Sequence, residues 1–153
     1  MSVKKLRTSR FGFTLDPVFQ VTQHASHRVV LDLLQREIGC GSVIRKHGQP
    51  ETLQYFVQNR RDLLAKVIPF LEAFPLLVKR DDLRKFKEVV RALEAREHWM
   101  LAGFERLLVL IFTMNFDGKQ RRYQLDELLG RIRERAGSSE TIRRTPDEVP
   151  VMI

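Results

Sequence analysis

The residue types that usually carry catalysis are sparse in this sequence and show no familiar catalytic spacing. Four histidines, His24, His27, His47 and His98, are scattered along the chain, and the single cysteine, Cys40, has no neighbours with zinc-site spacing. We identify neither a Ser/His/Asp or Cys/His arrangement that would activate a nucleophile nor a glycine-rich loop that would cradle phosphate. The lone cysteine also excludes an internal disulfide, and it predicts a reducing, cytoplasmic setting.

Basic side chains give a clearer chemical signal. The chain has 153 residues and a net charge of +8. Residues 1–10 hold Lys4, Lys5, Arg7 and Arg10 without an acid, and residues 119–136 hold six bases against three acids. This excess favours a polyanionic partner, nucleic acid first, although many soluble proteins are basic without binding DNA. No apolar run reaches the roughly 18 residues of a membrane span, so no membrane partner is expected.

Polar and apolar residues alternate along residues 11–23, as in a strand with one buried face. Thr14, Asp16 and Gln20 share the polar side of this strand. A predicted hairpin of residues 42–47 and 51–58 adds Ser42, Lys46 and Gln54 to it. Such side chains can read base edges and phosphates. The alternative is that they simply face water, as on most antiparallel sheets.

Helices must cover the other side of this sheet. A stripe of apolar residues predicts a helix over 25–38 with Ser26 as its N-cap, and a second helix opened by Asn59 or Asp62 and broken at Phe74–Pro75. Further helices are expected around residues 82–97, 100–115 and 122–135, and the tail from Gly137 has no apolar periodicity. The class is therefore α+β, with an antiparallel sheet and helices packed on one face.

Four stretches, in this order, resemble the LAGLIDADG homing-endonuclease family. They are PVFQVTQ at 17–23, the glycine pair Gly39 and Gly41, DLLAKVIPFL at 62–71, and the PLLVKR…FKEVV block within 75–90. The resemblance covers about residues 2–117. It implies a half-saddle that lies on double-stranded DNA, and an ancestral, Mg²⁺-dependent, site-specific double-strand cleavage in which acidic residues hold the metal.

The resemblance also implies site residues. Gln23 matches a strand-end glutamine at the cleavage-site water network, and Lys79 matches a basic residue near the phosphate. Asp16 would be repelled by phosphate, so it must pair with a base donor or a neighbouring cation. Val18 and Ile44 would contact thymine methyl groups. The DNA-contacting set that follows is Lys4, Lys5, Thr14, Asp16, Val18, Gln20, Thr22, Arg28, Ser42, Ile44, Lys46, Thr52 and Gln54. Without the resemblance, Lys79 and Arg28 are equally well explained as solvated surface charges.

The family's first helix, which carries the metal-binding acid, has no counterpart in this match, because Ser2–Lys5 resembles the end of the strand that follows that helix. We therefore expect a half-saddle truncated at its N-terminus, with no Mg²⁺ ligand of its own, and either a homodimer or a partner that supplies the helix. A misplaced start, a decayed reading frame and a split gene remain open as causes. The string LAGF at 101–104 resembles the motif's opening, but the position of the acid is Leu108, so we do not interpret it as the motif.

The expected organisation is an endonuclease-like domain over 1–117, a charged helix over 118–136 and a disordered tail over 137–153. The expected function is that of a DNA-binding homing-endonuclease domain without cleavage activity of its own. Two alternatives stay open. One is a non-catalytic DNA- or RNA-binding protein of the repressor or intron-maturase type on the same scaffold. The other is a basic helical protein that binds another protein through the surface left by the helix.

Overall fold

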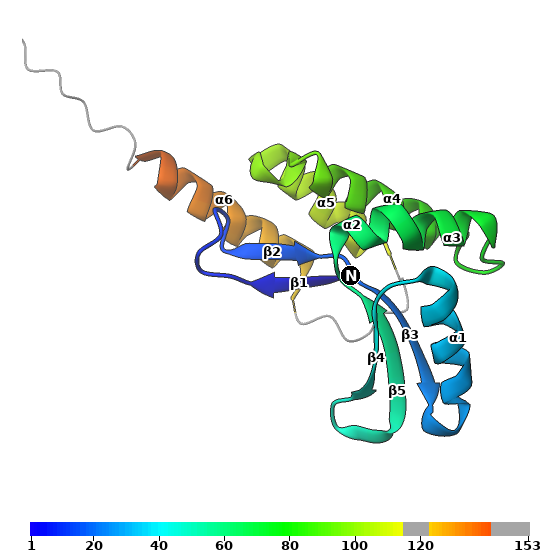
Figure 1. Cartoon of the computed structure of the whole chain (residues 1–153). Coiled ribbons are helices and arrows are strands. Elements are labelled where there is room, and N and C mark those ends of the chain that lie inside the picture. Colours follow the sequence, from blue (N-terminus) through cyan, green and yellow to red (C-terminus); the bar gives the residue numbers. More distant parts are fainter. Residues whose placement is uncertain (115–122, 142–153) are drawn as a thin grey trace, which may run out of the picture.

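The strands form two antiparallel sheets, a two-stranded ribbon, which we call the first ribbon, and a three-stranded sheet. A computed structural model describes residues 1–114 and 123–141. In it β1 (Ser2–Lys5) pairs with β2 (Phe13–Asp16), while β3 (Phe19–His24), β4 (Ser42–Lys46) and β5 (Gln49–Val57) form a three-stranded sheet in the order β3-β5-β4 (Figure 1). The single strand predicted over 11–23 is wrong in this respect, because the chain leaves the first ribbon at Pro17, which cannot donate a ladder hydrogen bond. The phase of the alternation survives the break, since Phe13 and Leu15 are buried and Gln20 and Thr22 are exposed.

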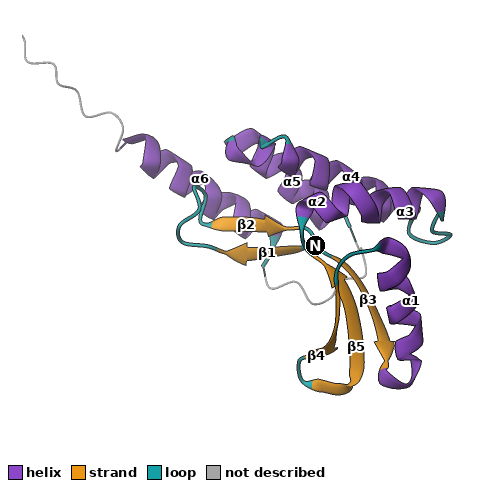
Figure 2. Cartoon of the chain, viewed as in Figure 1, coloured by secondary structure: helices purple, strands orange, loops and turns teal. Residues whose placement is uncertain are grey.

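The helices follow the predicted order (Figure 2). A 3-10 turn leads into α1, and a π-turn (Leu63–Val67) joins α2 to α3 in one helical stretch. A second 3-10 turn (Glu97–Trp99) precedes α5. The bounds are α1 (Arg28–Ile38), α2 (Arg60–Asp62), α3 (Ile68–Ala73), α4 (Arg80–Glu94), α5 (Leu101–Phe112) and α6 (Leu125–Thr141).

The two predicted N-caps have different outcomes. Asn59 is confirmed, because its Oδ1 accepts hydrogen bonds from the backbone N–H groups of Arg61 and Asp62 at 2.9 and 3.3 Å. Ser26 is not the cap of the first helical segment, since the side chain of His24 takes that role and its Nδ1 accepts from the Ser26 N–H at 3.2 Å. The strand therefore continues to His24, and the helix begins after it.

Two apolar clusters hold the helices to the inner face of the strands. Phe13 and Leu15 of β2 pack with residues of α4, α5 and α6 in the first cluster. Leu53, Tyr55 and Val57 of β5 pack with α1 and with the α2–α3 stretch in the second. Helix α4 belongs to both, because Val89 lies in the first cluster and its neighbour Val90 in the second. The two sheets are thus fixed to one helical layer.

The LAGF segment is part of this core. It opens α5, in which Phe104, Leu107 and Leu108 are buried. A Cβ at Gly103 would overlap the backbone carbonyl of Glu97, so glycine permits the close packing of α5 on the preceding 3-10 turn. The position that would hold a metal-binding acid is therefore a fully buried leucine, Leu108, at 0% exposure.

Helix α6 differs from the predicted charged helix in two ways. It packs into the first cluster through Leu128 and Ile132, both 0% exposed. It also runs to Thr141, so residues 137–141 are helical where a disordered tail was expected. The rest of that tail, residues 142–153, and the connection at 115–122 lie outside the described residues.

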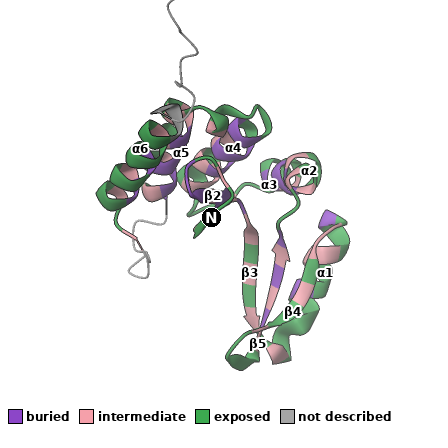
Figure 3. Cartoon of the chain, turned by 90° about the vertical axis from the view of Figure 1, so that its left-hand side faces the viewer, coloured by how far each residue is buried: buried purple, intermediate pink, exposed green. Residues whose placement is uncertain are grey.

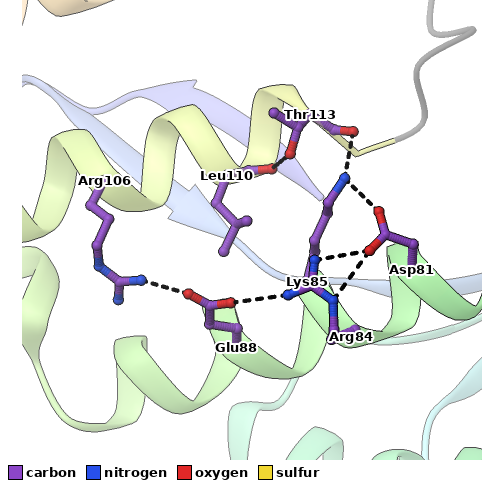
Figure 4. A network of polar contacts seen from close by, with 7 residues as sticks. All are labelled: Asp81, Arg84, Lys85, Glu88, Arg106, Leu110 and Thr113. Atoms are coloured by element: carbon purple, nitrogen blue, oxygen red, sulfur yellow. Dashed lines mark hydrogen bonds and ion pairs between the residues drawn. The ribbon is translucent and has the colours of Figure 1, made fainter.

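Exposed ion pairs tie α4 to α5 above the core (Figure 4). The Arg106 guanidinium contacts Glu88 and Glu97, each at 2.6 Å. The Lys85 ammonium contacts Asp81 at 2.7 Å and donates to the backbone carbonyl of Thr113 at 3.2 Å. These contacts fix the helical layer that supports the strands.

Candidate nucleic-acid interface

The polar side chains predicted to read DNA lie on the polar side of each of the two sheets, and we call these two sides together the outer face. In the three-stranded sheet, Phe56 of the central strand pairs with Gln20 on one side and Ser42 on the other, and Gln54 pairs with Thr22 and Ile44 in the same way. The first ribbon adds Lys4 beside Thr14, and Ser2 beside Asp16. Directly paired residues share a face. The outer face therefore comprises Lys4, Thr14, Asp16, Gln20, Thr22, Ser42, Ile44, Thr52 and Gln54, with His24 and Phe56.

Along the three-stranded sheet, no helix that the structure describes lies on this face. Thr14 and Asp16 of β2 instead line a cavity with Arg60 of α2 and Glu94 of α4. Figure 3 shows α1 along the opposite side of β3–β5–β4. The residues that alternate with the outer set, Leu53, Tyr55 and Val57, are buried beneath it. Ile44 is 43% exposed although it is apolar. An uncovered face with this mixture of side chains is a surface that can contact a ligand.

Polar contacts preorganise two places on the outer face. Gln20 Nε2 donates to Gln54 Oε1 at 3.1 Å, which leaves the Gln20 oxygen and the Gln54 amide nitrogen to offer an acceptor and a donor side by side. Asp16 Oδ2 accepts from Lys4 Nζ at 2.6 Å. The predicted need of Asp16 for a neighbouring cation is thereby met within the ribbon.

Glycines close the turn that positions β4. Gly41 has φ +80°, and a Cβ there would lie 2.6 Å from the Phe56 backbone oxygen. Beside it, Tyr55 donates its phenolic hydrogen to the Cys40 carbonyl at 2.8 Å, and burial, the largest cause, raises the pKa of Tyr55. A side chain at position 41 would push β4 away from β5, so this turn sets the spacing of the outer face.

For three other residues of the predicted DNA-contacting set, strand pairing does not determine whether the side chain lies on the outer face. A bulge between Arg45 and Lys46 shifts the register, so that Lys46 pairs with Gln49 and alternation alone no longer fixes its face. Val18 lies half-buried in the connection between β2 and β3. Arg28 is the first residue of α1, and its Nε contacts Asp32 Oδ2 at 3.2 Å.

The two predicted catalytic residues come from different layers. Gln23 is half-buried near the end of β3, and it alternates with the outer-face residues Thr22 and His24. Lys79 precedes α4 in the helical layer, with its ammonium 3.7 Å from Asp82. The described residues contain no group of three or more His, Cys, Asp or Glu side chains that could hold a metal ion.

Sequence reasoning missed two residues of the outer face. Phe56 alternates with the buried residues of β5 and pairs with Gln20 and Ser42, so it offers an aromatic contact among amides and hydroxyls. His24 pairs with Thr52, and its Nε2 lies 4.0 Å from Glu51. The alternation of the second strand was the signal that could have identified Phe56, but its neighbours follow only from the register of the folded sheet.

Comparison with known proteins gives a consistent result. The family model for LAGLIDADG endonucleases matches residues 1–90. Homing endonuclease I-ApeII of Aeropyrum pernix is 33% identical over 134 residues, which are 84% of this chain and 78% of that protein. DNA endonuclease I-CeuI of Chlamydomonas moewusii is 43% identical over 74 residues, 48% of this chain, and the match spans only 34% of that protein.

A solved structure resembles the whole arrangement. The archaeal intron-encoded homing endonuclease I-Vdi141I, complexed with DNA, superposes with a TM-score of 0.80 at 33% identity. The superposition covers 88% of this chain and 85% of that one.

Among the helices that the structure describes, none combines the length and apolar character needed to cross a membrane.

Proposed function

Because this chain belongs to the LAGLIDADG endonuclease family, we propose that its outer face binds double-stranded DNA in the manner of a homing-endonuclease half-saddle. The observation that carries the proposal is the register of β3, β5 and β4, which gathers Gln20, Thr22, Ser42 and Gln54 on a face that no described helix covers. Hydrogen-bonding side chains in this arrangement suit base edges in the major groove, which is wide enough for β-strands.

The residues divide by the part of the duplex that they suit. The Gln20–Gln54 pair presents one acceptor and one donor, which matches the acceptor and donor that adenine shows in the major groove. Ile44 suits a thymine methyl group. Lys4 lies beside Asp16, so it supplies less net charge than its type suggests. Lysine and arginine side chains outside the sheet must therefore supply much of the attraction to phosphate.

For the chemistry, the proposal is narrower. The family cleaves DNA with a divalent metal held by acids, and the family resemblance assigns no such acid to a residue of this chain. We therefore assign no hydrolytic step to Gln23 or Lys79 on their own. Lys79 would stabilise negative charge on a phosphate brought to it, and Gln23 would orient water.

A reducing, cytoplasmic setting, consistent with the single Cys40, remains part of the proposal.

A second copy of the chain is the proposed protein partner. Val29, Val30 and Leu33 of α1 are 63%, 41% and 42% exposed and lie within one turn of each other. The inner-face residues Phe19 and Val21 at the edge of β3 are only half-buried. A contact through these apolar side chains would bring two half-saddles together on one duplex, and so lengthen the DNA sequence that is read.

The test is DNA binding by matched charge variants of the full chain. Gln54→Glu adds a carboxylate to the outer face and keeps an acceptor for Gln20 Nε2. Ala65→Glu adds the same charge at an exposed position of the helical layer. Repulsion by phosphate should weaken binding by Gln54→Glu at least about tenfold, or about 1.4 kcal/mol. Fluorescence anisotropy with a random-sequence duplex library, across a salt titration, measures this.

Three outcomes are informative. Wild-type binding that falls steeply with salt, with Ala65→Glu close to wild type, supports the proposal. Absence of DNA binding by the wild type at low salt would refute the proposal, and so would an equal loss of DNA affinity in both variants. Adding Mg²⁺ to the same mixtures addresses the chemistry, where uncut duplex is expected and a specific double-strand cut would contradict the narrower assignment.

A further inference from the structure

A basic groove lies beside the strands, outside the outer face. It occupies about 590 Å³ between the turn that joins β1 to β2 and helix α6. Lys5 and Arg7 line it from the turn, and Arg131 and Arg135 line it from α6. Glu134 is the only acid in the lining that the structure describes. Segments that are more than a hundred residues apart in the chain therefore bring four cations together.

The groove is held in shape by Arg135. Its Nη2 donates to the backbone carbonyl of Arg7 at 2.6 Å, which ties α6 to the turn. Its aliphatic stem lies over Gly12, where a Cβ would come within 3.2 Å of Arg135 Cδ, and Gly12 itself has φ +76°. The turn therefore needs glycine both for its backbone conformation and for this contact. Such a fixed arrangement costs a ligand little additional ordering.

The cations of the groove are not equivalent. Arg131 contacts Glu127 at 2.7 Å, so part of its charge is compensated. Lys5 and Arg7 are exposed, and neither forms an ion pair with an acid among residues 1–114 and 123–138. These two residues carry uncompensated charge, and replacing their side chains breaks no ion pair within those ranges.

Strand β1 contributes a lysine to the outer face and another to the groove. Lys4 and Lys5 are neighbours in β1, and alternation directs Lys4 to the outer face with Thr14, while Lys5 pairs with Phe13 and lines the groove. The groove and the outer face thus lie on opposite sides of the same strand. The backbone of a duplex on the outer face would reach the groove where it passes the turn between β1 and β2.

We propose that this groove binds the phosphodiester backbone of duplex DNA beyond the bases that the outer face contacts. This inference rests on the proposed function, because it assumes that a duplex lies on the outer face. The groove supplies charge without base-reading groups, so it adds affinity and salt dependence rather than sequence preference. It also gives α6 a function besides packing.

The experiment uses two charge-matched double variants of the full chain. Lys5→Gln with Arg7→Gln removes two charges from the groove, and Arg84→Gln with Arg91→Gln removes two exposed charges from α4. Binding to a random-sequence duplex of about 30 base pairs, roughly three helical turns, is measured between about 50 and 200 mM salt.

The groove variant should lower the slope of log K against log salt by about 1 for each phosphate that the groove no longer neutralises, and weaken binding on the order of fivefold per charge near 150 mM salt. The control variant should keep the wild-type slope. On a duplex of about 12 base pairs, little more than one turn, the groove variant and wild type should converge.

Each contrary result has a separate meaning. A groove variant with the wild-type slope on the long duplex overturns the groove proposal while leaving the outer face intact. Equal losses of affinity in both double variants also overturn it, since the effect is then one of net charge. A selective loss of affinity for a structured RNA of the same length, with DNA binding unchanged, assigns the groove to RNA instead. If wild type does not bind duplex DNA at all, it is the proposed function that fails.

Discussion

At the scale of single residues, His98 shows how the fold can set a charge state. Its Nδ1 is buried without a hydrogen-bond partner among the described residues. Burial, first, and the nearby positive charge of Arg60, second, lower the pKa of His98 below its ordinary value of 6.5. Protonation of the His98 ring is therefore less favourable in the folded protein than in the unfolded chain.

This residue predicts a pH dependence of stability. Because the unfolded chain binds the proton more readily, the stability that neutral His98 permits is fully present above pH 6.5 and is lost as the pH falls below it. The lowered pKa values of Glu72 and Asp81, caused first by hydrogen bonds from Lys87 and Lys85, act only near and below their ordinary values of 4.5 and 3.8. The two effects therefore occupy different pH ranges.

Urea unfolding at several pH values, with an NMR titration of the His98 ring, measures this effect. The free energy of unfolding of wild type should decrease below pH 6.5, and His98→Phe should remove that decrease. A ring that titrates at or above 6.5 in the folded protein, or a variant with the wild-type pH profile, contradicts this prediction.

At the scale of elements, sequence patterns predicted faces better than they predicted boundaries. Alternation placed Thr14, Gln20 and Thr22 on the polar side of one strand, and the structure keeps this phase on both sides of a break at Pro17, with Thr14 in one sheet and Gln20 and Thr22 in the other. The break was not predicted, since the same alternation runs through both strands. The bulge after Arg45 was not predicted either, because a register shift depends on the partner strand and not on the strand's own residues.

Contacts across long sequence separations were also beyond prediction. The apolar stripe of α6 predicted a helix, but not that Leu128 and Ile132 pack under β2. Nor could the sequence bring Arg135 to Gly12, because that contact depends on where α6 lies against the turn. The outer face follows from local alternation, and the basic groove follows only from the tertiary fold.

The exposed apolar residues of α1 lead to a prediction about assembly. If a second copy covers Val29, Val30 and Leu33, the chain should sediment as a dimer whose fraction rises with concentration. Val30→Glu with Leu33→Glu should give monomers, because burying two carboxylates in an apolar contact is unfavourable. Ala65→Glu with Ala102→Glu, at exposed positions of the α2–α3 stretch and of α5, adds the same two charges and should remain dimeric. A wild type that is monomeric at every concentration tested rules out this contact.

At the scale of the whole molecule, the helical layer leaves the outer face open and adds charge beside it. Helix α4 joins both apolar clusters, and the Arg106 and Lys85 contacts of Figure 4 fix it to α5. One rigid layer thus carries β1–β2, the three-stranded sheet and the α6 side of the groove. A duplex can then be contacted by base-reading residues on the sheet and by phosphate-binding residues beside it.

The measurement that most directly tests the outer face is protection of single cysteines by DNA. Burial is the first cause of the raised pKa of Cys40, and a Cys40→Ala background removes this slow thiol altogether. In that background, Thr22→Cys places a thiol on the outer face, and Arg91→Cys places one at an exposed position of α4. Alkylation rates are compared with and without saturating duplex DNA at low salt. We predict that DNA slows alkylation of Thr22→Cys at least about tenfold and leaves Arg91→Cys unchanged. Protection of Arg91→Cys alone, or of neither thiol on a chain that has bound DNA, would contradict the central claim.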